Sequence, residues 1–471
     1  MTRFKTIVRY SSYLLGSRLL SRVLFTVFFI YAASLLGPEL FGALSFTLVT
    51  VELLSSIGDL GITRYAAREL VRHWDNKELL AGEVLFLQGL TSVIISLGGL
   101  LVILAWQPQY PKLQMLLLAM AAVLLSAVVN TTEAIFVATH NFLYSALFTF
   151  IGRLVYVSIG LIALYQGASV VVVMLGFLIG VIVEATLRLT VVLRRVTTFS
   201  FGFSRAQMMR ILSAIKPFAL TAAANIIFLR ANVVILEILS GDAAVGIYNI
   251  AFTLFVPFVW LPMILQRTVF PGLTRIYAMD PGKARIHTWQ WYRLMALVGI
   301  PIAISVGLLA GPVLSLFPAG YEESIPTLMV LMASIPLMLI SSVGFNTLQV
   351  VDREGSAALA STIAAVTCIL SSFILIALFN VIGAALAFLM ASTVLTGFLL
   401  CLVYNHFLKK SPLRLFIKPL IAGAAMLGAA LFIWNLSTWL APVVGIVVYT
   451  VVVFVIRAVR LTEIKTLIQD Q

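Results

Sequence analysis

The chain is a succession of apolar runs, each long enough to cross the hydrocarbon core of a bilayer as a helix. Such a span needs about 20 apolar residues. The runs are too long and too uniformly apolar for the strands of a membrane barrel, which alternate over about ten residues. The pattern therefore predicts an all-α integral membrane protein with about 14 transmembrane helices. The predicted spans are residues 12–36, 42–62, 81–105, 113–138, 144–165, 170–192, 217–239, 244–266, 291–316, 324–347, 356–379, 382–404, 417–434 and 442–457.

Composition excludes a large soluble domain. Hydrophobic residues make up 62% of the chain and charged residues only 10%, whereas a soluble protein carries roughly 25% charged residues. The two cysteines, Cys368 and Cys401, both lie in apolar runs and offer neither a disulfide framework nor the spacing of metal ligands. The sequence contains no glycine-rich phosphate loop, metal cluster or nucleophile motif, so we expect no cofactor and no enzymatic activity.

The loops between the runs fall into two alternating sets that differ in charge. One set, residues 37–41, 106–112, 166–169, 240–243, 317–323, 380–381 and 435–441, contains a single cation, Lys112. By the positive-inside rule the other set is cytoplasmic, so both termini are expected on the cytoplasmic side of the cell (inner) membrane. This topology accounts for the net charge of +13, and nucleic acid is not predicted as a partner. The basic set contains Arg3, Lys5, Arg9, Arg64, Arg68, Arg72, Lys77, Arg194, Arg195, Arg205, Arg210, Lys216, Arg267, Arg275, Lys283, Arg285, Arg353, Lys409, Lys410, Arg414, Arg457, Arg460 and Lys465.

Two short similarities indicate an internal repeat. Residues 36–42 match 240–246, with glycines five apart in each, and residues 161–165 match 375–379. In both cases the matched spans are six apart, an even number, so the two halves would share one orientation, as in many transporters. The alternative is that glycine at a span end simply caps a helix. The repeat predicts an N-terminal six-helix lobe at 1–200, a C-terminal six-helix lobe at 201–408, and two additional helices with a cytoplasmic tail at 409–471.

Four arginines, Arg18, Arg22, Arg153 and Arg230, lie inside the apolar runs. A guanidinium at that depth is costly, and it normally faces a cavity, a partner or a substrate. Arg18 is close enough to the end of its run to reach the headgroups instead, whereas Arg22 is deeper. Arg153 and Arg230 lie near the middle of their runs, where the alternative to a cavity is an ion pair with a buried carboxylate. The shared positive charge of the four residues favours an anionic substrate.

Two carboxylates are candidates for ion coupling. Glu52 is central in the second run, where a buried carboxyl group could take up a proton, and the alternative is a salt bridge to Arg22 or Arg153. Glu237 follows Arg230 by seven residues on nearly the same helix face, about 10 Å further along the axis, which is too far for direct pairing.

Other polar residues in the runs have simpler interpretations. Asn225 and Asn232 extend the polar stripe of Arg230 and Glu237, and such a stripe normally lines a cavity. Glu184 and Arg188 are four residues apart, so we expect them to neutralise each other on one helix. Prolines are expected to interrupt and kink two spans, namely Pro257, Pro262 and Pro271 in span 8 and its exit, and Pro326 and Pro336 in span 10. Residues 194–216 are expected to form an amphipathic cytoplasmic linker.

Several short motifs resemble the polysaccharide-biosynthesis (Wzx-type) flippases. They are SLLGPELFGALSF at 34–46, GDLG at 58–61, REL at 68–70, VGIYNIA at 245–251 and FPGLTR at 270–275. The resemblance covers about residues 5–405. It implies the fold of the multidrug and toxic compound extrusion exporters, in which two six-helix lobes surround a central cavity, within the multidrug/oligosaccharidyl-lipid/polysaccharide exporter superfamily.

The resemblance also implies a function. Relatives move an undecaprenyl-diphosphate-linked oligosaccharide, such as a lipopolysaccharide O-antigen or exopolysaccharide repeat unit, from the inner to the outer leaflet by alternating access. Cavity arginines would hold the diphosphate, and these map to Arg22, Arg153 and Arg230, with Arg18 as a further candidate. Membrane lipids, H⁺ or Na⁺, and a polysaccharide polymerase with other assembly proteins are the implied partners. Relatives often carry an acidic residue where this chain has Asn232, a departure that argues against ion coupling through that span.

Three other transport or enzymatic functions remain open at this stage, as does a scaffold role in a synthesis complex. The first is a cation-coupled multidrug exporter of the same fold, whose cavity should be acidic rather than basic. The second is a flippase for a lipid II-type peptidoglycan precursor. The third belongs to a different class, a multi-pass membrane enzyme that processes glycans, which we would expect to carry a large outer loop.

Overall fold

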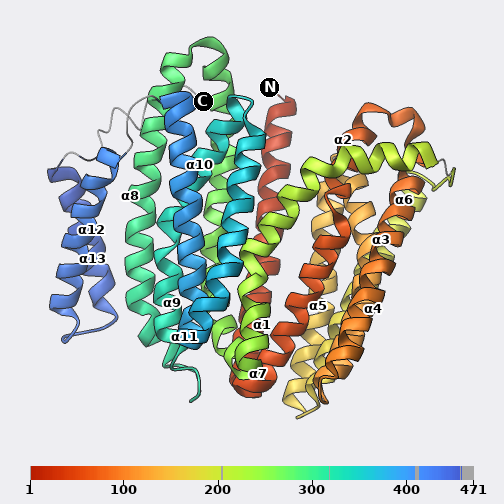
Figure 1. Cartoon of the computed structure of the whole chain (residues 1–471), viewed down its shortest axis with the longest axis horizontal. Coiled ribbons are helices and arrows are strands. Elements are labelled where there is room, and N and C mark those ends of the chain that lie inside the picture. The colour runs from red at the N-terminus through yellow and green to blue at the C-terminus, as the bar shows by residue number, and fades with distance from the viewer. Residues whose placement is uncertain (1, 203–204, 318, 409–412, 457, 459–471) are drawn as a thin grey trace. The chain divides into compact units, whose positions relative to one another are not determined.

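The structure is a computed structural model that describes residues 2–202, 205–317, 319–408, 413–456 and 458. Side chains are described from residue 24 onward, apart from residues 205–207, 210, 216–218, 221, 263–269, 271 and 413–415. Every regular element in this part of the chain is a helix (Figure 1). The chain divides into two compact units, residues 1–226 and 227–471.

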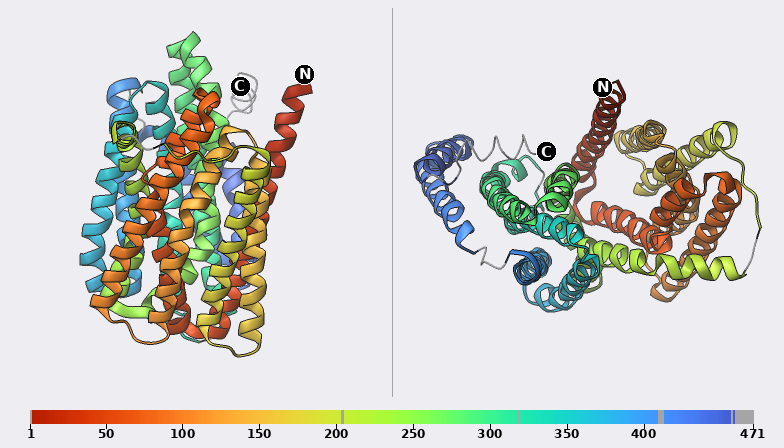
Figure 2. Two further views of the ribbon diagram at one scale, coloured as in Figure 1. Left: turned by 90° about the vertical axis from the view of Figure 1, so that its right-hand side faces the viewer. Right: turned by 90° about the horizontal axis from the view of Figure 1, so that it is seen from above.

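The first unit contains six helices and the start of a seventh. Most of these helices run side by side, whereas α2 and the start of α7 lie across one end of the unit (Figures 1 and 2). The helices are α1 (Thr2–Asp59), α2 (Ile62–Arg72), α3 (Lys77–Trp106), α4 (Lys112–Ala138), α5 (Phe142–Tyr165), α6 (Val170–Arg195) and the first part of α7 (Arg205–Met279), with a short 3₁₀ turn at Trp74–Asn76.

The second unit contains the rest of α7 and six further helices. They are α8 (Pro281–Leu314), α9 (Ser324–Ala333), α10 (Ile335–Val350), α11 (Glu354–Val403), α12 (Leu413–Ile433) and α13 (Leu440–Val455), with a π-helical turn at Tyr404–Leu408. The predicted kink at Pro336 is confirmed, because the helix is interrupted at Ser334, between α9 and α10.

The number of membrane spans agrees with the apolar runs of the sequence. Among the described residues, ten helical stretches are long and apolar enough to cross a membrane. Three of them contain one residue with a non-helical backbone, Gly37, Gly241 or Asn380, and each of these three therefore provides two spans. The shorter apolar helix α13 brings the total for the described residues to fourteen. The prediction of an all-α membrane protein is confirmed.

Gly37 and Gly241 adopt the same unusual backbone conformation. Their φ/ψ angles are 73°/172° and 79°/−174°, in the positive-φ region that glycine occupies without strain. They hold equivalent positions in the two halves of the proposed repeat, at the turn from one span into the next. The similarity of residues 36–42 to 240–246 is therefore also a similarity of backbone structure.

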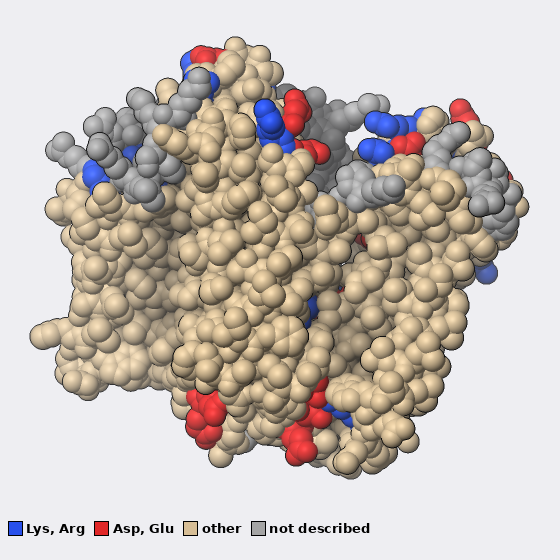
Figure 3. Space-filling model, viewed as in Figure 1, with Lys and Arg blue, Asp and Glu red and all other residues tan. Residues whose placement is uncertain are grey.

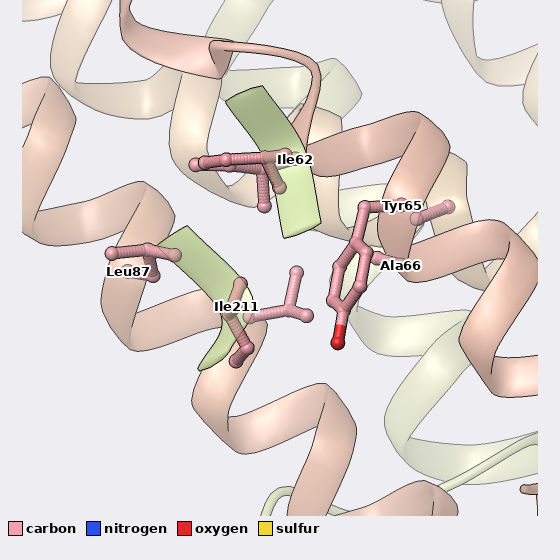
Figure 4. Packing of buried hydrophobic residues seen from close by; sticks show 8 residues of the cluster. Ile62, Tyr65, Ala66, Leu87 and Ile211 are labelled. Atoms are coloured by element: carbon pink, nitrogen blue, oxygen red, sulfur yellow. The ribbon is translucent and has the colours of Figure 1, made fainter. Parts of the chain in front are cut away.

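The cytoplasmic linker of the sequence analysis forms the start of α7 in the described residues and packs on the first unit. Ile211 and Ile215 are buried against Ile62 and Tyr65 of α2 and Leu87 of α3 (Figure 4). The apolar face of α2 is buried here, while Arg64, Arg68 and Arg72 lie on its exposed face. Glu69 lies 3.4 Å from Arg68 and 3.5 Å from Arg72, as expected for a solvated helix face.

The last helix pair packs on α8. Met426 of α12 and Tyr449 of α13 share a hydrophobic cluster with Leu297 of α8. The hydroxyl of Tyr449 also donates a hydrogen bond of 2.9 Å to the backbone oxygen of Leu297. Inside a bilayer a backbone oxygen has no water to bond, so the bond to the oxygen of Leu297 is favourable there. The helix pair is therefore held on α8 by a hydrogen bond as well as by apolar packing.

Charged side chains on the visible surface are distributed as expected for a membrane protein. Figure 3 shows an almost entirely tan middle in each unit, with Lys, Arg, Asp and Glu gathered at the ends of the helices. This distribution is what a lipid-facing surface requires, because a charged side chain in hydrocarbon is costly.

Candidate substrate site

Arg153 is a half-buried arginine in the middle of α5. Its guanidinium carbon lies 5.8 Å from the centre of the Phe25 ring of α1. Phe25 is itself held by aromatic contacts, with ring centres 4.5 Å from Phe29 and 6.0 Å from Tyr156. A cation over an aromatic face is favourable, and the contact is stronger where water is excluded. The aromatic cluster therefore provides a fixed platform for this cation at membrane depth.

Arg230 has a comparable environment in the second unit. Its guanidinium carbon lies 4.8 Å from the centre of the Phe252 ring, and Phe252 stacks on Tyr248 at 5.8 Å. The side-chain amide of Asn232 is fully buried and donates a hydrogen bond to the hydroxyl of Tyr248. Asn232 is thus occupied in positioning the aromatic pair beneath Arg230, which accounts structurally for an amide at this position.

Four further candidate site residues were predicted from the sequence. The side chains of Arg18 and Arg22 lie outside the described residues. Glu52 is exposed in the second segment of α1, and Glu237 is buried in α7. Arg153 belongs to the first unit and Arg230 to the second.

A buried ionic cluster lies near the α4–α5–α6 packing of the first unit. Arg188, only 3% exposed, contacts two carboxylates, Glu184 on its own helix and Glu133 on α4, each at 2.9 Å. Its other terminal nitrogen donates to the hydroxyl of Thr149 at 2.8 Å and to the backbone oxygen of Ser145 at 3.3 Å. The hydroxyl of Ser145 also donates to Glu133, and that of Thr149 donates to Glu184 at 2.8 Å.

This cluster confirms one expectation and extends it. The predicted ion pair of Glu184 and Arg188 is present. It agrees with the exclusion of both residues from the candidate substrate ligands. Glu133 was not predicted as the second carboxylate of the cluster. Its signal was an acidic residue inside an apolar run, but no local spacing connected it with Arg188, which is 55 residues away.

Close packing of α5 and α6 brings this cluster together. A Cβ atom on Gly180 would lie 2.5 Å from the backbone oxygen of Gly152, and one on Gly152 would lie 3.0 Å from the Cβ of Glu184. Small residues let helix backbones approach each other in membranes. The glycines therefore set the separation at which Glu184 faces α5.

Lys112, the single cation in the cation-poor set of loops, is buried between two aromatic rings. Its ammonium nitrogen lies 4.8 Å from the centre of the Phe46 ring and 4.6 Å from that of Trp106. The contacts join the start of α4 to the end of α3 and to the second segment of α1. We therefore interpret Lys112 as a structural residue rather than a substrate ligand.

Comparison with known proteins identifies the family. The family model described as polysaccharide biosynthesis protein matches residues 7–277, more than half of the chain. The chain belongs to this family. No curated protein sequence gave a significant match.

Solved structures show the same fold. A lipid II flippase MurJ in an inward closed conformation superposes with a TM-score of 0.79 at 16% identity, covering 94% of this chain and 98% of that one. An inward-facing multidrug resistance MATE family transporter of the MOP superfamily has a TM-score of 0.66 at 14% identity, covering 86% and 94%. A MOP superfamily transporter from Pyrococcus furiosus, whose binding pocket is described as having reverse polarity, has a TM-score of 0.57 at 13% identity, covering 88% and 93%.

The protein is thus a multi-pass membrane protein of the polysaccharide biosynthesis family with the fold of the MurJ and MATE transporters.

Proposed function

We propose that this protein is a flippase that moves an undecaprenyl-diphosphate-linked oligosaccharide from the inner to the outer leaflet of the cytoplasmic membrane by alternating access. The oligosaccharide would be an O-antigen or exopolysaccharide repeat unit. Family membership and the MurJ-like fold support transport of a lipid-linked substrate. Both termini would be cytoplasmic, and a polymerase and other assembly proteins would take over the product.

The observation that carries the proposal is a half-buried arginine over an aromatic ring at mid-helix in each unit, Arg153 and Arg230. A guanidinium that stacks on a ring keeps its N–H groups in the plane of its edges, where they can bind the oxygens of a phosphate bidentately. Arginine also keeps its charge at any physiological pH. An exporter of cationic drugs would have little use for cations at this depth.

Arg22 and Arg18 extend this proposal along the same helix, one turn apart. Glu52 and Glu237 are the proposed residues for coupling transport to H⁺ or Na⁺. A lipid II-type precursor is a second candidate substrate, because the MurJ structure that superposes with a TM-score of 0.79 is a lipid II flippase. The two substrates share the diphosphate and the prenyl chain and differ in the sugar.

The test is translocation of a fluorescent undecaprenyl-diphosphate oligosaccharide in proteoliposomes, measured as the fraction protected from a membrane-impermeant quencher. We expect Arg153→Ala and Arg230→Ala each to lower the rate by roughly 10- to 100-fold, since a hydrogen bond to a charged group contributes about 1.5–3 kcal/mol. Arg153→Lys and Arg230→Lys should retain an intermediate rate, because lysine keeps the charge without the bidentate geometry.

Arg72→Ala is the matched control. Arg72 is 61% exposed and contacts Glu69 on the surface of α2, so its loss should leave the rate unchanged. Wild-type rates in both the Arg153→Ala and the Arg230→Ala proteins would refute the proposal. Running the same assay with lipid II in place of the oligosaccharide lipid decides between the two candidate substrates.

A further inference from the structure

An apolar groove of about 590 Å³ lies between α1 and α5 of the first unit. Val27, Phe28 and Tyr31 line it from α1, and Val157, Leu161 and Tyr165 line it from α5. Phe28 forms its floor: it is 1% exposed, and its ring lies so close to Gly160 that a Cβ there would be 2.6 Å away. The walls remain open, with Val27 59% and Leu161 37% exposed.

The groove begins at the candidate substrate site. Val157 and Leu161 follow Arg153 by four and eight residues, so they share its face of α5 at about 6 and 12 Å further along the helix. On α1, the groove residue Leu24 adjoins Phe25, the ring beneath Arg153. The surface along α1 and α5 therefore continues from the cation of Arg153 to the apolar groove.

The far end of the groove is marked by tyrosines. Tyr31 and Tyr165 lie there, beside Gln166 at the end of α5. Amphipathic aromatic side chains are enriched where a membrane meets water. By the predicted topology this end is the outer surface, so the groove extends from mid-membrane through the outer half of the bilayer.

We propose that the α1–α5 groove holds the prenyl chain of the lipid-linked substrate while Arg153 binds its diphosphate. The chemistry of the strip matches an amphiphile with an anionic head and a long hydrocarbon chain, in that order. A lipid in the inner leaflet points its chain toward the outer leaflet, so a diphosphate that has risen from the cytoplasmic side to Arg153 carries its chain into the outer half. The groove would thus be filled in the loaded, inward-facing state. This inference rests on the proposed function and adds a site for the chain.

The experiment compares two probes that carry the same diphosphate oligosaccharide, one on an undecaprenyl chain and one on a geranyl chain, in the proteoliposome assay. Burial of apolar chain is favourable in proportion to the buried area, so wild-type protein should move the undecaprenyl probe at least about tenfold more efficiently at limiting concentration. Val27→Trp and Leu161→Trp fill the groove from its two walls, and each should bring the ratio of the two rates to about one by slowing only the undecaprenyl probe. Leu147→Trp, on an exposed position of α5 outside the groove, should keep the wild-type ratio.

A second measurement identifies the chain. With p-benzoylphenylalanine in place of Leu161, light should link the protein to the undecaprenyl probe, and Arg153→Ala should reduce this labelling. Labelling by phosphatidylglycerol of the vesicle that excess probe does not displace would show that an ordinary lipid fills the groove, and it would overturn the inference. An unchanged probe ratio in both tryptophan variants would also overturn it. If wild-type protein moves neither probe, the proposed function itself fails, a result distinct from either of these.

Discussion

At the scale of single residues, the arginines within the helices have two different kinds of environment. Arg188 is enclosed by Glu133, Glu184, Ser145 and Thr149, and hydrogen bonds to these groups satisfy its guanidinium within one unit. Arg153 lies on an aromatic platform instead. A cation between two carboxylates is already neutralised, so we assign a structural role to Arg188. Arg153 is the residue that we propose for substrate binding.

Loss of Arg188 should be strongly destabilising. Arg188→Ala leaves the partly buried Glu133 and Glu184 without their shared cation, and removing one partner of a buried ion pair costs about 3–5 kcal/mol. We expect a clearly lower melting temperature in detergent, followed by the fluorescence of a thiol-reactive dye or by light scattering. Arg195→Ala is the control: Arg195 is exposed and donates to the Tyr144 hydroxyl, so its loss should cost no more than about 1 kcal/mol. Equal melting temperatures for the two variants would contradict the structural role of Arg188.

At the scale of helices, glycine decides both where spans turn and how closely they pack. Gly37 and Gly241 take up positive φ at the turns that begin the second span of each half. Gly152 and Gly180 instead bring α5 and α6 into backbone contact. The first use depends on backbone freedom and the second on the missing side chain, so the same residue type has separate physical causes at the two places.

Two glycines within helices should respond in opposite ways to substitution by alanine, because only one of them lies at a close helix contact. Gly180→Ala would place a methyl group 2.5 Å from the backbone oxygen of Gly152, so α5 and α6 must separate, at a cost of about 1–3 kcal/mol. A Cβ on Gly98 of α3 meets nothing within 4 Å, and Gly98→Ala should stabilise the protein by about 0.5–1 kcal/mol through the lower backbone entropy of alanine. Melting temperatures of the two variants should shift in opposite directions. A downward shift of the same size in both would show that close packing of α5 and α6 is not the cause.

At the scale of the whole molecule, the distribution of loop charge predicts how the protein lies in the membrane. Cations are concentrated in alternate loops, although residues 139–143 contain none, and the one cation of the other loops, Lys112, is buried between aromatic rings. This asymmetry predicts cytoplasmic termini by the positive-inside rule.

This orientation can be tested by labelling single cysteines in cells. In a protein with Cys368→Ala and Cys401→Ala, a membrane-impermeant maleimide should label Gln109→Cys, in the loop between α3 and α4, from outside. It should label Asp75→Cys, in the turn before α3, only after the cells are made permeable. Labelling of Asp75→Cys in intact cells, with Gln109→Cys protected, would reverse the predicted orientation.

Contacts within one helix could be predicted from the sequence, whereas contacts between helices could not. The pair of Glu184 and Arg188 was predictable because both residues lie on one helix, four positions apart. Glu133 and Phe25 were not assigned as partners of Arg188 and Arg153, because they reach these arginines from other helices, and helix packing leaves no regular spacing in the sequence.

The sequence by itself determined that the chain crosses a membrane many times as helices and which cations lie within its apolar runs. These properties depend on the local cost of placing backbone and side chains in hydrocarbon, and that cost can be read from consecutive residues. Only the tertiary structure decided which cations are neutralised, which lie on aromatic rings, and that a groove continues from Arg153 along α5. These properties depend on which helix faces meet, and close packing of distant segments sets that outcome.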